Sequence, residues 1–249
     1  MLKKERQYYI LQQVNLHNKV LSSSFSVDIS VSEDTIRRDL QELSEDGKLI
    51  KVHGGALSRS FSQVHIPSNG VYSQHQKKTI AQKAIGLISN GMFVLTGGGT
   101  TIVEMARVLP AELKATFVSG SIAAILEYMD HPNIEVILIG DRVSKGSKIT
   151  VGSEAISKIR QLKADICFLG TNAIDLQNGV TDIDWEVVQL KKAMIESSAK
   201  VVCLAISEKI NTYQPIHICP VKKIDILITE LDKDDKLLQP YVNAGLTVL

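Results

Sequence analysis

Glycine and threonine residues follow one of the apolar segments of this chain, in the order Thr-Gly-Gly-Gly-Thr-Thr at residues 96–101. Glycine lets the backbone approach a ligand closely, and a helix beginning at Thr100 would present unpaired N–H groups at its N-terminus. With the two threonine hydroxyl groups, these donors favour an anion-binding site. The spacing is neither that of a P-loop nor that of the dinucleotide motif Gly-x-Gly-x-x-Gly. The alternative interpretation is a tight strand-to-helix turn with a threonine cap.

Similar polar segments follow other apolar segments of the chain. Ligands of open parallel sheets bind outside the carboxyl ends of the strands, so the segments after several strands can form one crevice. Lys191 lies on a later helical segment and is a candidate partner for a phosphate group, although a solvated lysine explains it equally well. The candidate ligand-binding residues are Gly97, Gly98, Gly99, Thr100, Thr101, Ser119, Gly120, Ser121, Gly140, Gly152 and Lys191.

A second set of candidate residues lies near the N-terminus, on a predicted helix at residues 32–45. Ser32 is a favourable N-cap, and Ile36 and Leu40, one turn apart, mark the buried side. The arginines between them then face outward, and arginine can pair with guanine or with phosphate in the major groove of DNA. The alternative is an exposed arginine pair balanced by neighbouring carboxylates. The candidate DNA-binding residues are Ser32, Thr35, Arg37, Arg38, Lys51 and His53.

Three helices and a hairpin are predicted to position these arginines. The third helix ends before Gly47, since glycine fits a left-handed C-terminal position. Basic residues on the first helix (Lys3, Lys4 and Arg6) and on the hairpin are further candidates for phosphate contacts. The predicted helices are at 10–14, 23–30 and 32–45, and the predicted hairpin is at 48–57.

Helix and strand patterns alternate in the rest of the chain, after a polar segment that contains Pro67 and Gly70. Short apolar strands that alternate with helices predict an α/β domain with a mostly parallel sheet covered on both faces. The predicted strands are at 92–95, 116–119, 134–139, 166–170, 201–205 and 226–229, and the predicted helices at 80–88, 100–109, 122–129, 154–162, 186–198 and 234–243. The predicted divisions are a DNA-binding domain at 1–58, a linker at 59–75 and an α/β domain at 76–249.

Composition restricts the class of protein further. The 249 residues are 44% hydrophobic and 22% charged, which excludes disorder and a disulfide scaffold. A net charge of +1 means that any nucleic-acid surface must be local. The three cysteines lie in apolar segments and are expected to be reduced core residues. The first residues do not resemble a signal peptide, and no apolar run reaches the roughly 18 to 20 residues of a membrane span, so we expect a cytoplasmic protein without membrane contact.

The sequence contains no motif typical of a metal site or of a redox centre. The six histidines are scattered without the spacing of metal ligands, and no His-Glu-x-x-His, Cys-x-x-Cys or Gly-x-Ser-x-Gly pattern occurs. We therefore expect no metal, no cofactor and no catalytic residues of these classes.

The predicted third helix and hairpin carry a string of residues typical of one family. The string comprises Val31–Leu40 (Val-Ser-Glu-Asp-Thr-Ile-Arg-Arg-Asp-Leu), Glu42-Leu43, Gly47 and Lys51–Ala56. It resembles the helix-turn-helix of DeoR-family bacterial transcriptional regulators. The resemblance implies a winged helix-turn-helix with Ser32–Glu45 as recognition helix and Lys48–Leu57 as wing. Residues 24–26 depart from the family, with Ser-Phe-Ser in place of the usual Glu-Leu-Ala.

Several C-terminal segments resemble the sensor domain of the same family. These segments are Gly99–Thr101, Ser119–Ser121, Ile139-Gly140, Asp165–Gly170, Asn178–Thr181, Lys191–Ile195 and Ser207–Lys209. The resemblance implies a fold shared with ribose-5-phosphate isomerase and CoA transferases, and an effector that is a phosphorylated sugar or related metabolite. Gly97 and Ile206 stand where the family usually carries aspartates, so we expect weaker recognition of sugar hydroxyl groups and phosphate as the main anchor.

The combined interpretation is a DNA-binding transcriptional regulator, a repressor of a carbohydrate or related metabolic operon. Its expected partners are a double-stranded DNA operator, a phosphorylated effector and further copies of itself, because one helix-turn-helix reads only a short half-site. One alternative is an enzyme resembling sugar-phosphate isomerases, with Asp165, Asp175, Asp182 or Glu186 as the base. Another is a DNA-binding protein whose sensor pocket has lost its ligand.

Overall fold

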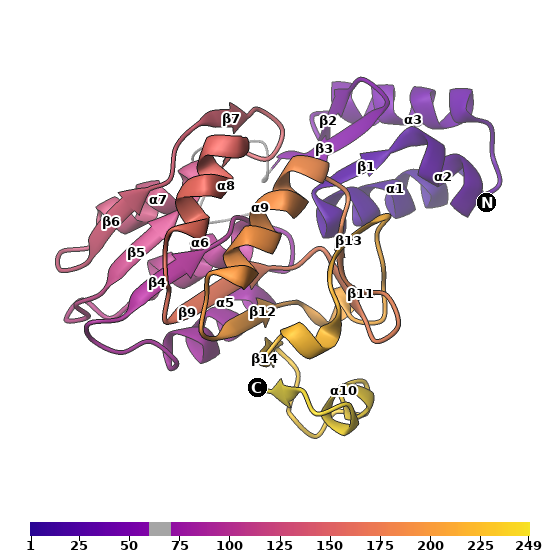
Figure 1. Cartoon of the computed structure of the whole chain (residues 1–249). Coiled ribbons are helices and arrows are strands. Elements are labelled where there is room, and N and C mark those ends of the chain that lie inside the picture. The colour runs from indigo at the N-terminus through magenta and orange to yellow at the C-terminus, as the bar shows by residue number, and fades with distance from the viewer. Residues whose placement is uncertain (60–70) are drawn as a thin grey trace. The chain divides into compact units, whose positions relative to one another are not determined.

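The structure is a computed structural model that describes residues 1–59 and 71–249 (Figure 1). It divides into two compact units, Met1–Tyr72 and Ser73–Leu249. Most of the predicted linker at 59–75 lies outside the described residues. Its last two residues, Gln74 and His75, already belong to the first helix of the second unit.

The N-terminal unit combines three helices with a small antiparallel sheet. Its elements are α1 (Lys3–His17), β1 (Lys19–Leu21), α2 (Ser22–Asp28), α3 (Glu33–Glu45), β2 (Leu49–Val52) and β3 (Gly55–Ser58). The sheet has the order β1-β3-β2. The three predicted helices and the hairpin are present. The additional strand β1 was not predicted, because three residues are too few to show a periodicity.

Strand β1 holds the hairpin β2–β3 against the rest of this unit. The register places Val20 opposite Ala56 and Leu21 opposite Gly55. A Cβ atom on Gly55 would lie 1.9 Å from the carbonyl oxygen of Val20, so only glycine permits this approach.

One apolar core joins the three helices and the hairpin. Its buried side chains include Ile10, Val14, Phe25, Ile36, Leu40, Leu43 and Leu49. Helix α3 begins after Ser32, whose Oγ accepts a 3.3 Å hydrogen bond from the backbone N–H of Thr35. It ends at Glu45, and Gly47, two residues further on, has a φ of +69° that allows the closing hydrogen bonds of a Schellman motif.

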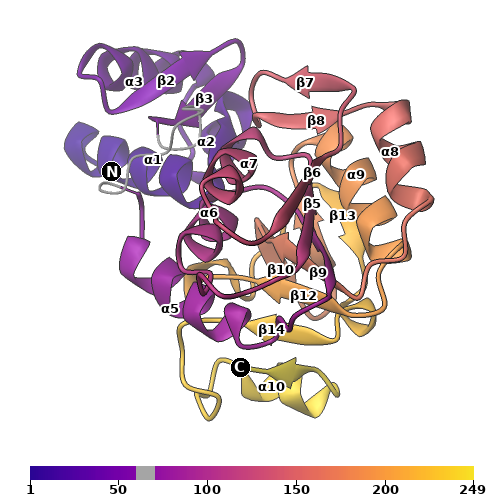
Figure 2. The same ribbon diagram turned by 90° about the vertical axis from the view of Figure 1, so that its left-hand side faces the viewer.

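Seven parallel strands form the central sheet of the C-terminal unit. They are β4 (Phe93–Thr96), β5 (Thr116–Ser119), β6 (Glu135–Leu138), β9 (Ile166–Gly170), β12 (Val201–Leu204), β14 (Ile226–Ile228) and β15 (Thr247–Val248), in the order β15-β14-β12-β9-β4-β5-β6. Figure 2 shows helices α5 (Gln74–Ile85), α6 (Thr100–Arg107) and α7 (Ile122–Met129) on one face, with α8 (Ser153–Arg160) and α9 (Trp185–Glu196) on the other. The predicted α/β architecture is thereby confirmed.

Several short elements of this unit were not predicted. Strands β7 (Arg142–Ser144) and β8 (Ile149–Val151) form a hairpin, and β10 (Ala173–Asp175), β11 (Gly179–Asp182) and β13 (Ile216–Cys219) form a second antiparallel sheet. Two 3₁₀ turns are η1 (Ser207–Lys209) and η2 (Val221–Lys223). The helix predicted at 234–243 is wrong in extent, since α10 spans only Gln239–Asn243. Asp235 instead accepts a 2.8 Å hydrogen bond from the N–H of Leu237, a turn that competes with helix.

The C-terminal core is apolar and contains the cysteines. Cys167, Cys203 and Cys219 are all buried and unpaired, as expected for reduced core residues. No helix within residues 1–59 and 71–249 is long and apolar enough to span a membrane.

Candidate functional site

The exposed side of α3 carries the two arginines that the sequence marked for DNA. Arg37 donates to Glu33 at 3.3 Å and to Asp34 at 3.5 Å, and its side chain is 56% exposed. Arg38 is exposed and makes no ion pair or hydrogen bond with any residue that the structure describes. The guanidinium group of Arg38 could therefore bind DNA without losing a contact with a described residue. That of Arg37 would first have to break its contacts with Glu33 and Asp34.

Ser32 and Thr35 stabilise the first turn of α3. Their hydroxyl oxygens lie 2.9 Å apart, and Ser32 also caps the helix through the Thr35 N–H. Both side chains thus hold the end of the helix that would enter a DNA groove first.

The hairpin β2–β3 extends the surface of α3. The ammonium group of Lys51 donates a 2.8 Å hydrogen bond to Gln41. Gln41 lies one turn beyond Arg37 and Arg38 on the same helix, so Lys51 lies beside the arginine face. His53 is exposed at the turn of the hairpin. Helix and hairpin therefore present their basic side chains on one surface.

Four loops of the C-terminal unit meet at the carboxyl ends of the sheet strands. A Cβ atom on Gly98, after β4, would lie 2.6 Å from Cδ1 of Ile149 and 3.5 Å from Cβ of Ser121. A Cβ atom on Gly170, at the end of β9, would lie 2.4 Å from the carbonyl oxygen of Gly98. Glycine therefore lets the loops after β4, β5 and β9 and the hairpin β7–β8 approach one another.

Backbone donors gather where α6 begins. The N–H groups of residues 98–102 make no hydrogen bond within the described part of the chain, and the first helical bond runs from Val103 to the carbonyl of Gly99 at 3.2 Å. The side chains of Thr100 and Thr101 are buried, and their hydroxyl groups have no hydrogen-bond partner among the described residues. This end of α6 can thus donate several hydrogen bonds to an anion.

Ser119, Gly120 and Ser121 shape the neighbouring loop. The Ser119 hydroxyl donates to the carbonyl of Thr96 at 3.0 Å and accepts from the N–H of Ser121 at 3.1 Å. Ser121 caps α7 through a 3.4 Å hydrogen bond from Ala124. The hydroxyl groups of Ser119 and Ser121 thus have hydrogen-bond partners within the protein, and these hydrogen bonds stabilise the loop after β5.

Gly140 and Gly152 lie in the loops around the hairpin β7–β8. Gly152 has a φ of +118°, and a Cβ atom there would lie 2.3 Å from the carboxylate of Asp141. The same carboxylate accepts a 3.2 Å hydrogen bond from the N–H of Glu154, at the start of α8. A protein carboxylate therefore occupies the N-terminus of α8, whereas no described atom lies within 4 Å of a Cβ atom on Gly140.

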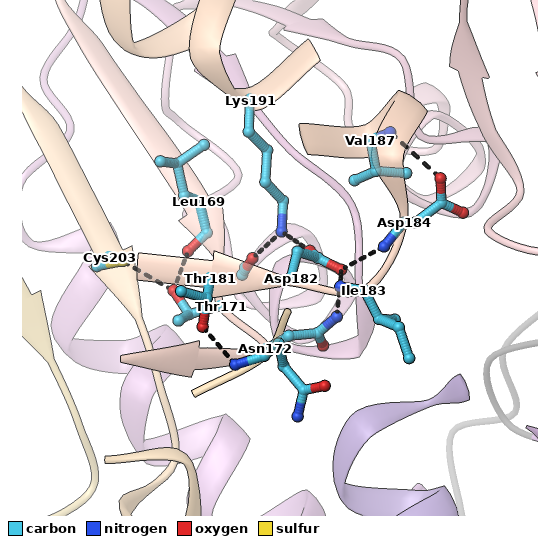
Figure 3. A network of polar contacts seen from close by, with 12 residues as sticks. Leu169, Thr171, Asn172, Thr181, Asp182, Ile183, Asp184, Val187, Lys191 and Cys203 are labelled. Atoms are coloured by element: carbon cyan, nitrogen blue, oxygen red, sulfur yellow. Dashed lines mark hydrogen bonds and ion pairs between the residues drawn. The ribbon is translucent and has the colours of Figure 1, made fainter. Parts of the chain in front are cut away.

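Lys191 is held by a buried carboxylate rather than pointing to solvent. Figure 3 shows its ammonium group reaching from α9 to Asp182 at 2.7 Å, and it also donates to the carbonyl of Gly170 at 2.9 Å. Burial opposes ionisation of Asp182, but the Lys191 charge and hydrogen bonds from Ile183 and Asn172 lower the pKa of this carboxyl group. The positive charge of Lys191 is thus already matched within the protein.

Two other buried lysines lie near the same strand ends, and sequence reasoning did not select them. Lys209 donates a 2.8 Å hydrogen bond to the carbonyl of Thr171 and makes no ion pair with a described residue. Burial lowers the pKa of Lys209 to about 7, and the charges of Lys77 and Lys191 act in the same direction. Burial also lowers the pKa of Lys77 to about 8. The sequence contains one indication of a role for Lys209: like the glycine segments, it follows an apolar strand closely, in this case β12.

The acidic residues considered as catalytic bases have structural partners. Asp165 accepts a 2.7 Å hydrogen bond from the N–H of Phe93, at the beginning of β4 and thus at the opposite end of the strands from the glycine loops. Asp175 accepts hydrogen bonds from the turn before β11, and Glu186 pairs with Arg142. Within the described residues, no group of three or more histidine, cysteine or acidic side chains is placed to hold a metal ion.

The two units define a class of protein. A winged helix-turn-helix with exposed basic side chains, joined in one chain to an α/β unit with a cluster of hydrogen-bond donors at its strand ends, is typical of a DNA-binding transcriptional regulator with a sensor domain. The chain belongs to the DeoR family. The family model of the DeoR-like helix-turn-helix domain matches residues 6–61, and that of the DeoR C terminal sensor domain matches residues 72–231.

Several transcriptional regulators are similar to this chain over almost the whole length of both proteins. The HTH-type transcriptional regulator GolR of Listeria innocua is 29% identical over 98% of this chain and 97% of its own, and GlpR of Haloferax volcanii is 31% identical over 100% and 98%. The glycerol-3-phosphate regulon repressor of Escherichia coli is 26% identical over 96% and 95%. Among solved structures, a D-ribose-5-phosphate isomerase is similar with a TM-score of 0.40 at 16% identity, over 55% of this chain and 53% of that one.

Proposed function

We propose that this chain is a repressor whose affinity for operator DNA is set by a phosphorylated sugar or related metabolite in the C-terminal crevice. The observation that carries the proposal is the buried amino group of Lys209, which has a pKa of about 7 and no counter-ion among the described residues. Thr171, its hydrogen-bond partner, follows Gly170, and Gly170 lies against Gly98 at the start of the donor-rich loop. A phosphate group bound there would supply the missing negative charge and accept the hydrogen bonds of the α6 N-terminus.

The names of the relatives support the same function. One is a repressor of a glycerol-3-phosphate regulon, and the matched C-terminal family is a sensor domain. Gly97 and Ile206 bring no carboxylate to the crevice, so we expect phosphate to be recognised more strictly than the sugar hydroxyl groups.

Calorimetry with pentose and hexose phosphates, each compared with its parent sugar, tests the proposal. We expect binding only of the phosphorylated member of a pair, and weaker binding by Thr100→Val and Lys209→Met. The matched control is Thr247→Val, which makes the same change on the exposed position of edge strand β15. Equal affinity for both members of a pair, or equal behaviour of Thr100→Val and Thr247→Val, would refute the phosphate assignment.

The regulatory direction is tested on DNA. We expect the bound effector to release the chain from its operator, and operator DNA to weaken effector binding by the same factor, since linkage is reciprocal. Tighter DNA binding in the presence of effector would indicate an activator or a co-repressor mechanism instead.

A sensor is favoured over an isomerase by the partners of the acidic residues. Asp182 is neutralised by Lys191, Glu186 pairs with Arg142, and Asp165 lies at the other end of the sheet. We therefore expect no turnover of the sugar phosphates that bind, and measurable isomerisation would overturn this expectation.

We further propose that the chain acts in the cytoplasm as a homo-oligomer, with residues 1–58 as DNA-binding domain, 59–75 as linker and 76–249 as sensor. One helix-turn-helix reads only a short half-site. Two copies related by symmetry would read two half-sites, and together they would recognise an operator with adequate specificity. Sedimentation that shows a monomer both free and on operator DNA would contradict the proposal.

A further inference from the structure

Helix α1 is joined to the recognition helix α3 by a set of polar contacts, which we call the α1–α3 clasp: Lys3, Arg6 and Gln7 on α1, with Asp39 and Glu42 on α3. Arg6 binds both carboxylate oxygens of Asp39, through Nε to Oδ2 and through Nη2 to Oδ1 at 3.2 Å. Lys3 and Gln7 bind the two oxygens of Glu42 at 2.7 and 2.8 Å.

The central pair of the clasp is buried. The side chain of Asp39 is 2% exposed and that of Arg6 is 12% exposed. Asp39 directly follows Arg37 and Arg38 in the sequence, yet it pairs with neither of them. The carboxylate of the Arg-Arg-Asp string therefore joins two helices and does not neutralise the DNA-facing arginines.

A bidentate pair constrains α3 in a way that its apolar contacts do not. Side chains such as Ile36 and Leu40 hold the helix against the core, but apolar packing is non-directional. Two parallel hydrogen bonds between a planar guanidinium and a planar carboxylate fix both the rotation of α3 and its position along its axis. Bidentate pairing of arginine with a base edge requires this alignment.

We propose that Arg6 and Asp39 are positioning residues for DNA recognition, which hold α3 in the orientation that brings Arg37 and Arg38 to base edges. On this proposal Arg6 does not contact a DNA phosphate, although its charge and its place on the first helix make it a candidate for one.

The sign of one substitution separates positioning from charge. Asp39→Asn removes a negative charge from the DNA-binding unit, and electrostatics alone predicts tighter binding to DNA. The proposal predicts the opposite for a specific sequence, because α3 loses its alignment. Glu45→Gln is the matched control, since it removes the same charge from the same helix at an exposed residue whose side chain, among the described residues, accepts a hydrogen bond only from Gln41.

The test is fluorescence anisotropy of the full-length chain, with a duplex selected by the wild type from random-sequence DNA and with a shuffled duplex of the same composition. We expect Asp39→Asn and Arg6→Met each to lose about ten-fold or more in affinity for the selected duplex, the scale of one lost base contact. Affinity for the shuffled duplex should change little, and Glu45→Gln should bind both duplexes at least as well as wild type.

Salt dependence distinguishes the two roles of Arg6. A lost phosphate contact lowers the slope of log affinity against log salt by about 0.9. The proposal expects Arg6→Met to keep the wild-type slope. A lowered slope, or equal losses on both duplexes, would assign Arg6 to phosphate and overturn the proposal, as would Asp39→Asn binding the selected duplex as tightly as Glu45→Gln.

Arg6→Lys is the control for a loss of folding in the other variants. It keeps the positive charge but not the bidentate geometry, so its thermal midpoint should stay near that of wild type. Its affinity for the selected duplex should lie between those of wild type and Arg6→Met. A folded Arg6→Lys chain with wild-type affinity for the selected duplex would show that the bidentate pair does not position α3.

Discussion

The ammonium group of Lys191 lies 2.7 Å from the carboxylate of Asp182, and both side chains are almost completely buried. Lys209, close to the same strand ends, binds only the carbonyl oxygen of Thr171 among its described hydrogen-bond partners. One lysine therefore has its counter-charge within the fold, and the other has none in contact. On the proposed function the two lysines have different roles: Lys191 stabilises the fold through Asp182, and Lys209 is the group that a bound anion would neutralise.

Removing the carboxylate of Asp182 should destabilise the C-terminal unit strongly. Asp182→Asn leaves the Lys191 charge buried without its partner, and such changes cost about 3–5 kcal/mol. The double variant Asp182→Asn with Lys191→Met should recover part of this loss, because no buried charge remains. Urea unfolding measures both, and a double variant less stable than Asp182→Asn would contradict this account of the pair.

Lys209 should make stability depend on pH. Its pKa in the folded chain, about 7, lies below the ordinary lysine value of 10.5, so the unfolded chain binds more protons between these two pH values. Unfolding free energy therefore rises with pH in this window. Relative to Lys209→Met, wild type should gain almost nothing below pH 6, about 0.7 kcal/mol per pH unit near pH 7 and about 1.4 kcal/mol per pH unit above pH 8. Urea unfolding of both chains at several pH values measures the difference, and a constant difference would show that Lys209 titrates normally.

A methyl group at Gly170 should disturb the packing of the loops at the strand ends. The new Cβ atom in Gly170→Ala would lie 2.4 Å from the carbonyl oxygen of Gly98, a backbone atom that cannot rotate away. We expect a loss of about 1–3 kcal/mol in unfolding free energy and weaker binding of sugar phosphates. Gly146→Ala is the control, since it lies outside the candidate ligand-binding residues and its Cβ atom would meet open space among the described residues. Equal stability of the two variants would show that the loops adjust freely.

Arg38 should contribute more to specific DNA binding than Arg37. Arg37 gives up its contacts with Glu33 and Asp34 when it binds DNA, whereas Arg38 has no such partner among the described residues. Arg38→Ala should cost about 1–3 kcal/mol of operator affinity if it contacts a base, and Arg37→Ala less. Lys200→Ala, an exposed lysine of the C-terminal unit, is the control. The same anisotropy assay measures all three, and the reverse order of Arg37 and Arg38 would contradict the prediction.

Regular elements of this fold were predictable from local pattern. Ile36, Leu40 and Leu43 repeat with helical spacing between a serine cap and a terminal glycine, so α3 could be placed from the sequence. Six of the seven parallel strands were equally clear, because each is an apolar run, whereas the two-residue strand β15 was not predicted. Strands such as β1 and β10 have three residues each and exist through pairing with distant segments, so no local signal marks them.

The approach of the glycine loops to one another was predictable from the sequence, whereas the charges around them were not. Glycine segments after strands indicate where loops converge. The partner of Lys191 is Asp182 on β11, a strand without a recognisable periodicity, so the sequence offered no reason to pair them. The burial of Lys209 is equally a property of the assembled fold. The Arg6–Asp39 pair joins residues 33 positions apart, which local pattern cannot reveal.

The pairing of β4 with β9 sets the order in which the chain can acquire its structure. These two strands form the middle of the seven-stranded sheet, and the Phe93–Asp165 contact between them joins residues 72 positions apart. The hairpin β2–β3 needs only a short turn between its strands. Closure of a long loop is slow and local contacts form fast. As the chain leaves the ribosome, the first unit can therefore reach its native form while the centre of the second sheet still awaits a strand that has not been synthesised.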